Sequence, residues 1–309
     1  MQRIVIAEFM DAAAVERLRA QHDVHYDPAL VDDPARLFDE ARRARALIVR
    51  NRTQVRGELL AALAHCKVVG RLGVGLDNID VAACEARGIR VIPATGANAL
   101  SVAEYVIASA MLLLRGAYAS TAEVAAGRWP RTALSNGRET AGKTLGLVGF
   151  GAIGQLTARL AQALGMRTVA FDAMMDAGHP AFAAARTQPL GLEALLAQSD
   201  VVSLHVPLVE GTRNLFHAAR IAAMKDGAVL VNTSRGGIVD EQAVAGALRA
   251  GRLGGAALDV FDAEPLAASP HFEGCPNLLL TPHIAGVTAE SNERVSGLIA
   301  DRVLEALAP

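Results

Sequence analysis

A glycine-rich segment in the middle of the chain carries the clearest chemical signal in the sequence. It follows the apolar run 144–148 and reads Gly149-Phe150-Gly151-Ala152-Ile153-Gly154. In a strand-turn-helix unit of this spacing, the first glycine allows a tight turn, the second lets the backbone approach a pyrophosphate, and the third permits close packing of helix on strand. Unpaired N–H groups at the start of the helix can then bind the anion. The segment therefore predicts a phosphate-binding turn for a dinucleotide.

An acidic residue stands where such turns meet the adenosine ribose. Asp172 comes directly after the next apolar run, 167–171, and lies 18 residues after Gly154. A carboxylate at this place accepts hydrogen bonds from the ribose hydroxyls and repels a 2′-phosphate, so we expect NAD rather than NADP. The alternative is a glycine-rich turn in an α/β protein that binds no nucleotide, with Asp172 as a capping residue. The combination of strand, spacing and acid favours the dinucleotide site.

Polar residues also stand at the C-terminal ends of three further strand candidates, 201–205, 228–232 and 255–259. The ligand crevice of an open α/β sheet lies at the carboxyl ends of its strands, so residues at these ends are candidates for the same site. The groups found there are His205-Val206-Pro207, Asn232-Thr233-Ser234-Arg235 and Asp259.

The elements that would position these residues alternate regularly along the chain. Short β-branched runs are separated by helical patterns, which is typical of parallel sheets built from βαβ units. A first series has strand candidates at 3–7, 24–26, 46–49, 68–71 and 90–92, and a second series starts at residue 143. We therefore predict an α/β fold with two doubly wound parallel-sheet domains.

The segment between the two series predicts a connecting helix followed by an arm. Residues 98–115 are rich in alanine and leucine, and Ser101 and Glu104 have capping-box spacing near the start of this helix. Residues 117–142 are polar, have weak periodicity and contain the only tryptophan, Trp129. This segment suits an arm that contacts a second copy of the chain, and a plain surface loop is an equal alternative.

The composition excludes several classes of partner. The chain has 309 residues, 52% of them hydrophobic and 20% charged, with a formal net charge of -2. Such a chain has enough apolar material for two buried cores but no broad basic field. We therefore expect neither nucleic acid nor a membrane surface as a partner.

Cysteine usage and the N-terminal residues indicate the compartment. Cys66, Cys84 and Cys275 are an odd number without CxxC spacing, which argues against a disulfide framework or a metal site. The chain opens on the strand candidate 3–7 with no signal-peptide pattern. Its longest apolar stretch, 102–114, is too short to span a bilayer. We expect a cytoplasmic protein without a metal site.

Six ordered motifs extend over almost the entire chain. They are GRLGVGLDNID (70–80), LGLVGFGAIG (145–154), VVSLHVPL (201–208), VNTSRGGIVDE (231–241), GAALDVFDAEPL (255–266) and LLTPHIAG (279–286). In type and order these motifs resemble the D-isomer-specific 2-hydroxyacid dehydrogenase family, and within it the phosphoglycerate dehydrogenase group. The resemblance is very specific for the family but much less specific for the substrate.

The resemblance implies a domain organisation and an activity. A Rossmann NAD-binding domain, residues 98–284, would be inserted into a smaller flavodoxin-like substrate domain formed by residues 1–97 and 285–309. The implied reaction is the NAD-dependent interconversion of a small 2-hydroxy acid and its 2-keto acid. As in the family, we expect a homodimer.

The resemblance further implies a catalytic triad of Arg235, Glu264 and His283. The guanidinium is a permanent, planar cation that can bind the substrate carboxylate with two hydrogen bonds. A histidine can give and regain a proton near neutral pH, and a carboxylate on its other nitrogen fixes the tautomer and favours the imidazolium. Taken singly, the three residues could instead be a surface cation, a turn residue and a buried histidine. Their order within matching motifs favours the triad.

The resemblance assigns other motif residues to the ligands. Asp259 would lie near the nicotinamide amide, and His205 would pack against the cofactor. Besides the glycine turn and Asp172, the expected cofactor-binding residues are His205, Val206, Pro207, Thr212, Thr233, Ser234, Asp259, His283 and Gly286. The expected substrate-binding residues are Arg50, Asn51, Arg52, Val74, Gly75, Asn98 and Arg235.

The identity of the substrate is less sharply predicted. Arg50, Arg52, Arg71 and Arg131 supply more positive charge than a methyl or hydroxymethyl substituent requires, which favours a distal phosphate or sulfonate. Arg52 and Arg71 could equally be solvated surface charges. The substrates 3-phosphoglycerate, 3-sulfolactate, glycerate with hydroxypyruvate, glyoxylate and D-lactate therefore stay open. A nonenzymatic NAD-binding scaffold of the corepressor type is the alternative of another class.

Overall fold

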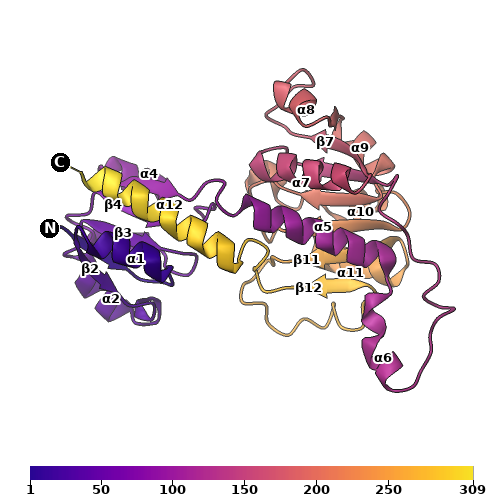
Figure 1. Cartoon of the computed structure of the whole chain (residues 1–309), viewed down its shortest axis with the longest axis horizontal. Helices are drawn as coiled ribbons and strands as arrows, with labels where there is room; N and C mark the ends of the chain where they lie inside the picture. The colour runs from indigo at the N-terminus through magenta and orange to yellow at the C-terminus, as the bar shows by residue number, and fades with distance from the viewer. Residues whose placement is uncertain (309) are drawn as a thin grey trace. The chain divides into compact units, whose positions relative to one another are not determined.

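The computed structural model describes residues 1–308 and divides them into two compact units (Figure 1). One unit combines Met1–Asn98 with the C-terminal segment that begins at Val287, and the other is Ala99–Gly286. The first unit is therefore built from two stretches of chain that flank the second unit in the sequence. Each unit has its own parallel sheet and its own hydrophobic cores.

The sheet of the first unit has five parallel strands in the order β2-β1-β3-β4-β5. This is the flavodoxin-like order, in which the strand order reverses between β1 and β3. The strands are β1 (Arg3–Ile6), β2 (Asp23–Tyr26), β3 (Ala46–Val49), β4 (Val68–Arg71) and β5 (Arg90–Pro93).

Helices cover both faces of this sheet because its strands are apolar on both sides. Ile4 and Ile6 of β1 belong to the core under α1 (Ala12–Arg19) and α12 (Ala289–Leu307), whereas Val5 belongs to the opposite core. The short helix η1 (Leu30–Asp32) contributes Leu30 to that opposite core. The helices on that side are α2 (Pro34–Ala41), α3 (Gly57–Ala62) and α4 (Val81–Ala86).

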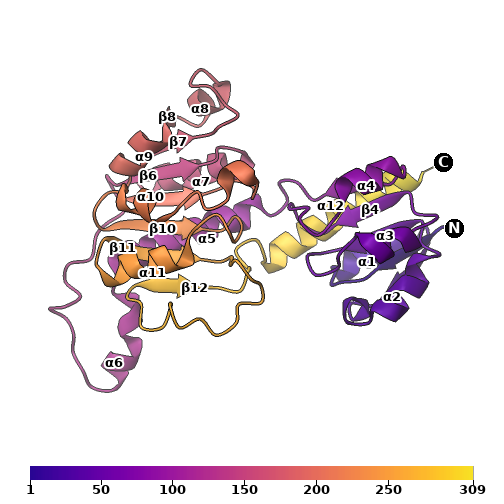
Figure 2. The same cartoon turned by 180° about the vertical axis from the view of Figure 1, so that it is seen from behind.

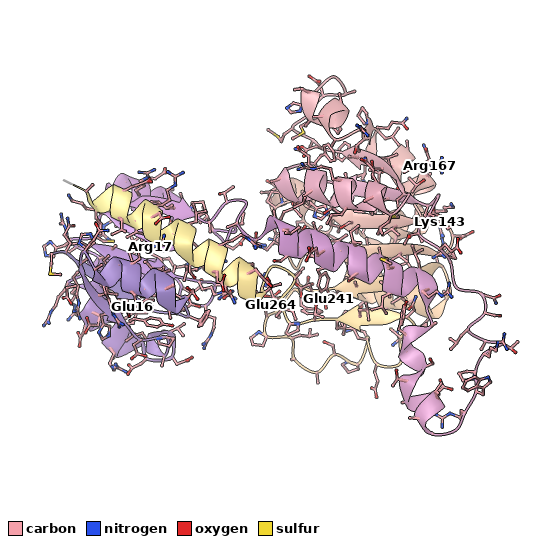
Figure 3. All side chains as sticks on the ribbon, viewed as in Figure 1. Glu16, Arg17, Lys143, Arg167, Glu241 and Glu264 are labelled. Carbon is pink, nitrogen blue, oxygen red and sulfur yellow. The ribbon has the colours of Figure 1, made fainter. Side chains whose placement is uncertain are left out.

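Helix α12 is the last element of the chain and packs in the first unit. Its Ile299 is fully buried, and a Cβ atom at Gly70 of β4 would lie 2.8 Å from the Ile299 side chain. On the exposed side of the helix, Arg17 of α1, which is labelled in Figure 3, forms a 2.5 Å ion pair with Asp301. Exposed pairs contribute about 0–1 kcal/mol, whereas burying one aliphatic side chain contributes about 1.5–3 kcal/mol. Apolar packing therefore holds the helix in place.

The sheet of the second unit has seven parallel strands in the order β12-β11-β10-β9-β6-β7-β8. Six of them, from β8 to β11, have the Rossmann order, and β12 adds a strand at the edge beside β11. The strands are β6 (Thr144–Val148), β7 (Arg167–Phe171), β8 (Gln188–Pro189), β9 (Val201–Leu204), β10 (Ala228–Asn232), β11 (Leu253–Leu258) and β12 (Leu278–Leu280).

Helices also cover both faces of the second sheet (Figure 2). On one face, α5 (Ala99–Arg115), α7 (Ala152–Ala163) and α8 (Pro180–Ala184) share a core with alternate side chains of β6 and β10. The other face has its own core, which includes side chains of α9 (Leu192–Gln198), α10 (Ala218–Ala222) and α11 (Glu241–Arg249). Both faces of the sheet are thus buried, and the loops at the strand ends provide surface for ligands.

The connecting helix and the segment after it differ in part from the sequence expectation. Helix α5 begins at Ala99, which is buried and continues the apolar face, so Ser101 and Glu104 lie inside the helix. The capping-box interpretation of this pair is therefore wrong. After α5, the chain forms η2 (Tyr118–Ser120) and α6 (Thr121–Ala125) and then an exposed segment in which Trp129 is 77% exposed. Strands β8 and β12 were not predicted because they have only 2 and 3 residues.

Three general features of the described residues bear on the compartment and on metals. No single helix among them is long and apolar enough to cross a membrane, and α5 meets that test only together with Tyr118–Ala125, from which it is bent by 73°. Residues 1–308 contain no group of three or more His, Cys, Asp or Glu side chains arranged to hold a metal ion. Cys66, Cys84 and Cys275 are free thiols.

Candidate active site

The glycine turn follows β6 and ends at the start of α7. Gly149 has φ = 93°, and a Cβ atom there would collide with the carbonyl oxygen of His205. A Cβ atom at Gly154 would lie 2.5 Å from the carbonyl oxygen of Gly149, so the helix packs directly on the turn. Gly151 instead faces open space and is exposed, as is Ala152 at the first position of α7. The first N–H groups of the helix are therefore accessible to a phosphate.

Asp172 holds this turn from the end of β7. Its Oδ2 accepts a 2.7 Å hydrogen bond from the N–H of Phe150, and its Oδ1 accepts one of 2.8 Å from the N–H of Met174. Each carboxylate oxygen has a further lone pair, so the same side chain can also accept hydrogen bonds from ribose hydroxyls. The acid therefore fits a dinucleotide site and shapes the turn as well.

Residues after β9 and β10 form a wall next to the glycine turn. Burial lowers the pKa of the His205 imidazole to about 4, so the ring is neutral at physiological pH, and its Nε2 lies 3.0 Å from Ser203 Oγ. The hydroxyl of Ser234 donates a 2.6 Å hydrogen bond to the carbonyl oxygen of Leu204 and joins the two strand ends. Within the described chain, Thr233 Oγ1 is buried and has no hydrogen-bond partner. A polar group of a bound cofactor would satisfy this hydroxyl.

The remaining cofactor-binding candidates lie in the same unit. The Thr212 hydroxyl accepts a 2.8 Å hydrogen bond from the N–H of Val209 and donates one of 2.5 Å to the carbonyl oxygen of Pro207, so it shapes the loop after β9. Ile153 lies in the first turn of α7, and Gly286 is the last residue of the unit. The contacts of these residues with the cofactor stay predictions.

Arg235 lies on the loop after β10, and Asn232 fixes that loop. Asn232 Nδ2 donates a 3.0 Å hydrogen bond to the carbonyl oxygen of Arg235, and Asn232 Oδ1 accepts one of 3.0 Å from the N–H of Ser234. Arg235 Nη1 donates a 2.6 Å hydrogen bond to the carbonyl oxygen of Ser234. The half-buried guanidinium is therefore held at the strand end where a substrate carboxylate is expected.

His283 and Glu264 form the central hydrogen bond of the site. The Nδ1 of His283 lies 2.7 Å from Oε2 of Glu264, which is labelled in Figure 3, and the side chains are 37% and 33% exposed. Burial raises the pKa of the Glu264 carboxyl. Two kinds of interaction outweigh burial and hold the pKa below its ordinary value: hydrogen bonds from His283 and from the N–H of Phe261, and the charges of His283 and Arg235. The carboxylate is therefore ionised at neutral pH and orients the ring. This contact engages Nδ1 of His283 and leaves Nε2 as the ring nitrogen for the predicted proton transfer, which stays a prediction.

Asp259, directly after β11, holds the turn that contains His283. The side chain is buried, and its Oδ1 accepts hydrogen bonds from Thr281 Oγ1 (2.5 Å) and from the N–H of Ile284 (2.8 Å). Its Oδ2 accepts one of 2.8 Å from the N–H of Ala285, and its carbonyl oxygen accepts one of 2.8 Å from the N–H of His283. His283 has φ = 55°, a left-handed conformation that costs about 1–3 kcal/mol for such a residue. These hydrogen bonds offset that cost.

Tyr105 of α5 extends the Asp259 network. Its hydroxyl lies 2.6 Å from Thr281 Oγ1, and burial raises the pKa of the hydroxyl, so it is neutral and able to donate. Sequence reasoning missed Tyr105 and Thr281, because neither a tyrosine inside a helix nor a threonine before a Pro-His pair has a spacing that indicates this contact.

Glu8 organises the candidate substrate loop of the first unit. It lies just beyond β1, is buried, and its carboxylate accepts hydrogen bonds from the N–H groups of Arg50 (2.8 Å), Arg52 (3.2 Å) and Thr53 (3.0 Å). Asn78 Nδ2 donates hydrogen bonds to the carbonyl oxygens of Arg50 and Thr53. Neither Glu8 nor Asn78 was predicted. An acid at the carboxyl end of the first strand was the signal that could have identified Glu8.

The predicted substrate-binding side chains of the first unit have different surroundings. Arg50 is half-buried, and its Nη2 donates a 2.9 Å hydrogen bond to Asn292 Oδ1. Arg52 is exposed and forms an ion pair with Asp32. The others are Asn51 and Val74, which are exposed, Gly75, which is half-buried, and Asn98, whose buried Oδ1 has no hydrogen-bond partner within residues 1–308. Their contacts with a substrate stay predictions.

Comparison with known proteins identifies the family of the chain. The family described as D-isomer specific 2-hydroxyacid dehydrogenase, NAD binding domain, matches residues 107–285, which include the glycine turn and the predicted triad. The (S)-sulfolactate dehydrogenase of Chromohalobacter salexigens is 54% identical over 99% of this chain and 99% of its own. The D-3-phosphoglycerate dehydrogenase of Mycobacterium leprae is 39% identical over 99% of this chain but only 57% of its own length.

Solved structures show the same fold over the whole chain. The TT0316 protein of Thermus thermophilus has a TM-score of 0.89 at 34% identity, covering 99% of this chain and 97% of its own. A glyoxylate reductase from Paecilomyes thermophila has a TM-score of 0.86 at 30% identity, covering 99% and 95%. The chain belongs to the D-isomer specific 2-hydroxyacid dehydrogenase family. It is an NAD-dependent oxidoreductase that acts on the CH–OH group of a 2-hydroxy acid.

Replacing Glu264 by glutamine should move the pH profile of keto-acid reduction toward lower pH. In the predicted mechanism the protonated imidazole is the acid for reduction, and the lowered pKa of Glu264 keeps a negative charge next to the ring at neutral pH. Without that charge, the alkaline limb of kcat/KM should move down by about 1 pH unit. Initial rates of NADH oxidation across the pH range measure the shift. Glu273→Gln, at an exposed acid of the same unit, is the control, and an unshifted profile in Glu264→Gln would remove the carboxylate from this role.

Proposed function

We propose that the chain is an NAD-dependent dehydrogenase that interconverts 3-sulfolactate and 3-sulfopyruvate. The observation that carries the proposal is the 54% identity to a protein named (S)-sulfolactate dehydrogenase over 99% of both chains. The phosphoglycerate dehydrogenase of M. leprae matches at 39%, and this chain spans little more than half its length. The sequence alone left sulfolactate and phosphoglycerate as alternative anionic substrates. The higher identity to the sulfolactate dehydrogenase favours sulfolactate.

Side chains of the second unit supply what this reaction requires. Arg235 binds the substrate carboxylate and polarises the 2-keto oxygen. In reduction, His283 gives its Nε2 proton to that oxygen, and in oxidation it takes the proton from the 2-hydroxyl, while Glu264 stabilises the imidazolium. A bound NAD, held by the glycine turn and Asp172, would supply the hydride acceptor for oxidation at C2, and its reduced form would supply the hydride for reduction.

Two arginines of the first unit are the strongest candidates for binding the distal sulfonate. Arg71 Nη1 donates a 3.1 Å hydrogen bond to the carbonyl oxygen of Leu72 and occupies the space beside Gly73, where any Cβ atom would collide with it. Arg50 is held in place through Asn292, as described above. Both guanidinium groups are thus ordered before the substrate binds, which reduces the entropy cost of binding. Arg52 is already paired in an exposed ion pair and is the weaker candidate.

A panel of 2-keto acids tests the substrate. We expect kcat/KM for 3-sulfopyruvate to exceed that for hydroxypyruvate, glyoxylate and pyruvate, which lack a charged distal group, by at least about tenfold, since a hydrogen bond to a charged group contributes about 1.5–3 kcal/mol. NADH consumption is measured with 3-sulfopyruvate, 3-phosphohydroxypyruvate, hydroxypyruvate, glyoxylate and pyruvate. A higher value for 3-phosphohydroxypyruvate would return the assignment to the phosphoglycerate type. NADH binding without turnover of any of them would favour the nonenzymatic scaffold.

Selection of NAD over NADP is proposed to rest on Asp172. Its carboxylate is fixed by the N–H groups of Phe150 and Met174, and its negative charge repels a 2′-phosphate. The same assay with NADPH in place of NADH should therefore give a lower kcat/KM. Equal values for the two cofactors would show that this carboxylate does not select between them.

A homodimer formed through the segment after α5 is proposed as the assembly. Tyr118, Val124 and Trp129 are 64%, 44% and 77% exposed, and exposed aromatic and aliphatic side chains concentrated in one segment are typical of an interface. Light scattering should give about twice the chain mass of 32.2 kDa, and a value near one chain mass would contradict the dimer.

We also propose a cytoplasmic location, because the three cysteines are free thiols, and cell fractionation tests it.

A further inference from the structure

The loops that carry Arg235 and Glu264 touch each other directly. A Cβ atom at Gly236 would overlap the carbonyl oxygen of Phe261 and would lie 2.7 Å from the nitrogen of Asp262. The residue after the proposed substrate-binding arginine therefore packs on the main chain just before the proposed catalytic glutamate. Only a glycine allows this approach.

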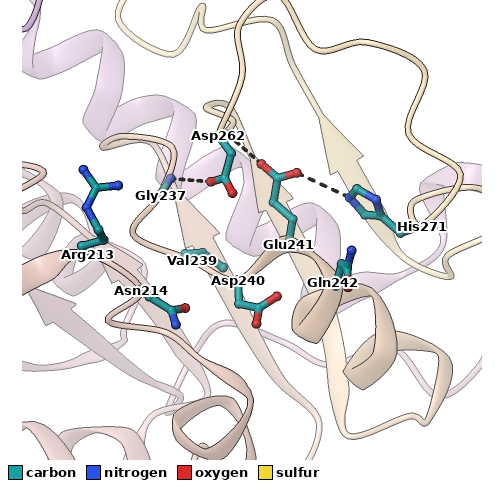
Figure 4. Close-up of a pocket in the computed structure, with 9 residues that line it drawn as sticks. All are labelled: Arg213, Asn214, Gly237, Val239, Asp240, Glu241, Gln242, Asp262 and His271. Atoms are coloured by element: carbon teal, nitrogen blue, oxygen red, sulfur yellow. Dashed lines mark hydrogen bonds and ion pairs between the residues drawn. The ribbon is translucent and has the colours of Figure 1, made fainter.

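Asp262 joins these two loops by hydrogen bonds, which Figure 4 shows. Its Oδ1 accepts a 2.6 Å hydrogen bond from the N–H of Gly237, on the loop of Arg235. Its own N–H donates a 2.8 Å hydrogen bond to Oε1 of Glu241, the first residue of α11. Asp262 thus fixes one loop through its side chain and is itself fixed through its main chain.

Glu241, which accepts the hydrogen bond from the N–H of Asp262, is itself held in place. The carboxylate of Asp240 caps α11 by accepting a 2.9 Å hydrogen bond from the N–H of Ala243, and the Glu241 side chain is only 12% exposed. Glu241 Oε2 lies 3.4 Å from Nε2 of His271. Glu241 and Asp262 both line a cavity of about 370 Å³, and each directs one carboxylate oxygen at a main-chain N–H group (Figure 4).

We propose that Asp262 and Glu241 are positioning residues that lock the loop of Arg235 to the loop of Glu264. They take no part in proton or hydride transfer and act only through the residues that they hold. This inference rests on the catalytic roles proposed above for Arg235 and Glu264. A displacement of about 1 Å at a catalytic group can lower the rate by about 100-fold, so the loss of one of these hydrogen bonds should be measurable.

Paired substitutions distinguish the effect of losing the hydrogen bond from the effect of removing the rest of each side chain. Asp262→Ala should raise the KM for the keto acid and lower kcat/KM by about tenfold, because the loop of Arg235 loses its acceptor. Asp262→Asn keeps an Oδ1 that can accept from the N–H of Gly237 and should restore most of the wild-type kcat/KM. Likewise, Glu241→Ala should lower kcat/KM, whereas Glu241→Gln, which keeps an acceptor oxygen, should restore most of the wild-type value. Gln242→Ala, which alters the wall of the same cavity, is the control and should behave as wild type.

Two measurements test the proposal on the full chain. Steady-state kinetics use whichever 2-keto acid of the panel is reduced fastest, so the result does not depend on the sulfopyruvate assignment. Hydrogen exchange of the peptide that contains Gly237 needs no turnover, and it should accelerate in Asp262→Ala but stay slow in Asp262→Asn. Three results would overturn the proposal. The first is wild-type kinetics and wild-type hydrogen exchange in Asp262→Ala, and the second is a loss of kcat/KM in Asp262→Asn as large as that in Asp262→Ala. The third is a loss of NADH affinity in Asp262→Ala as large as its loss of kcat/KM.

Discussion

The hydrogen bond between His283 Nδ1 and Glu264 Oε2 is the interaction on which the proposed chemistry depends. It sets the tautomer of the ring, leaves Nε2 for the substrate oxygen, and places a negative charge where the imidazolium needs one. The carboxylate keeps that charge because its hydrogen-bond donors and neighbouring cations hold its pKa low in spite of burial. A ring without this partner would lack a fixed orientation.

Sheet topology explains how three residues far apart in the sequence come to act together. Arg235, Glu264 and His283 follow β10, β11 and β12, which are adjacent parallel strands, so their loops emerge at the same edge of the sheet. Local contacts then set the geometry within that edge. Asp259 holds the histidine turn, and Asp262 joins the other two loops. The hydrogen bonds at the strand ends thus give defined positions to a guanidinium, a carboxylate and an imidazole.

The parts of the site that rest on short-range patterns could be predicted from the sequence, and those that rest on distant contacts could not. The glycine turn and the place of Asp172 follow from spacing along one βαβ unit. Tyr105 and Asp262 have ordinary residue types, and their partners come from other elements, so no local pattern indicates their roles. The capping box at Ser101 failed for a related reason, because α5 already begins at the buried Ala99, before the point that the local spacing suggests.

The most direct test of the account is the turnover of His283→Ala together with its affinity for NADH. The imidazole is assigned to proton transfer, and the phosphate-binding turn is assigned to a different loop, so the two quantities should separate. Turnover is expected to fall by about 10²–10⁴-fold, the usual contribution of a general acid or base, while the dissociation constant for NADH measured by fluorescence titration stays close to the wild-type value. Wild-type turnover in this variant would contradict the account.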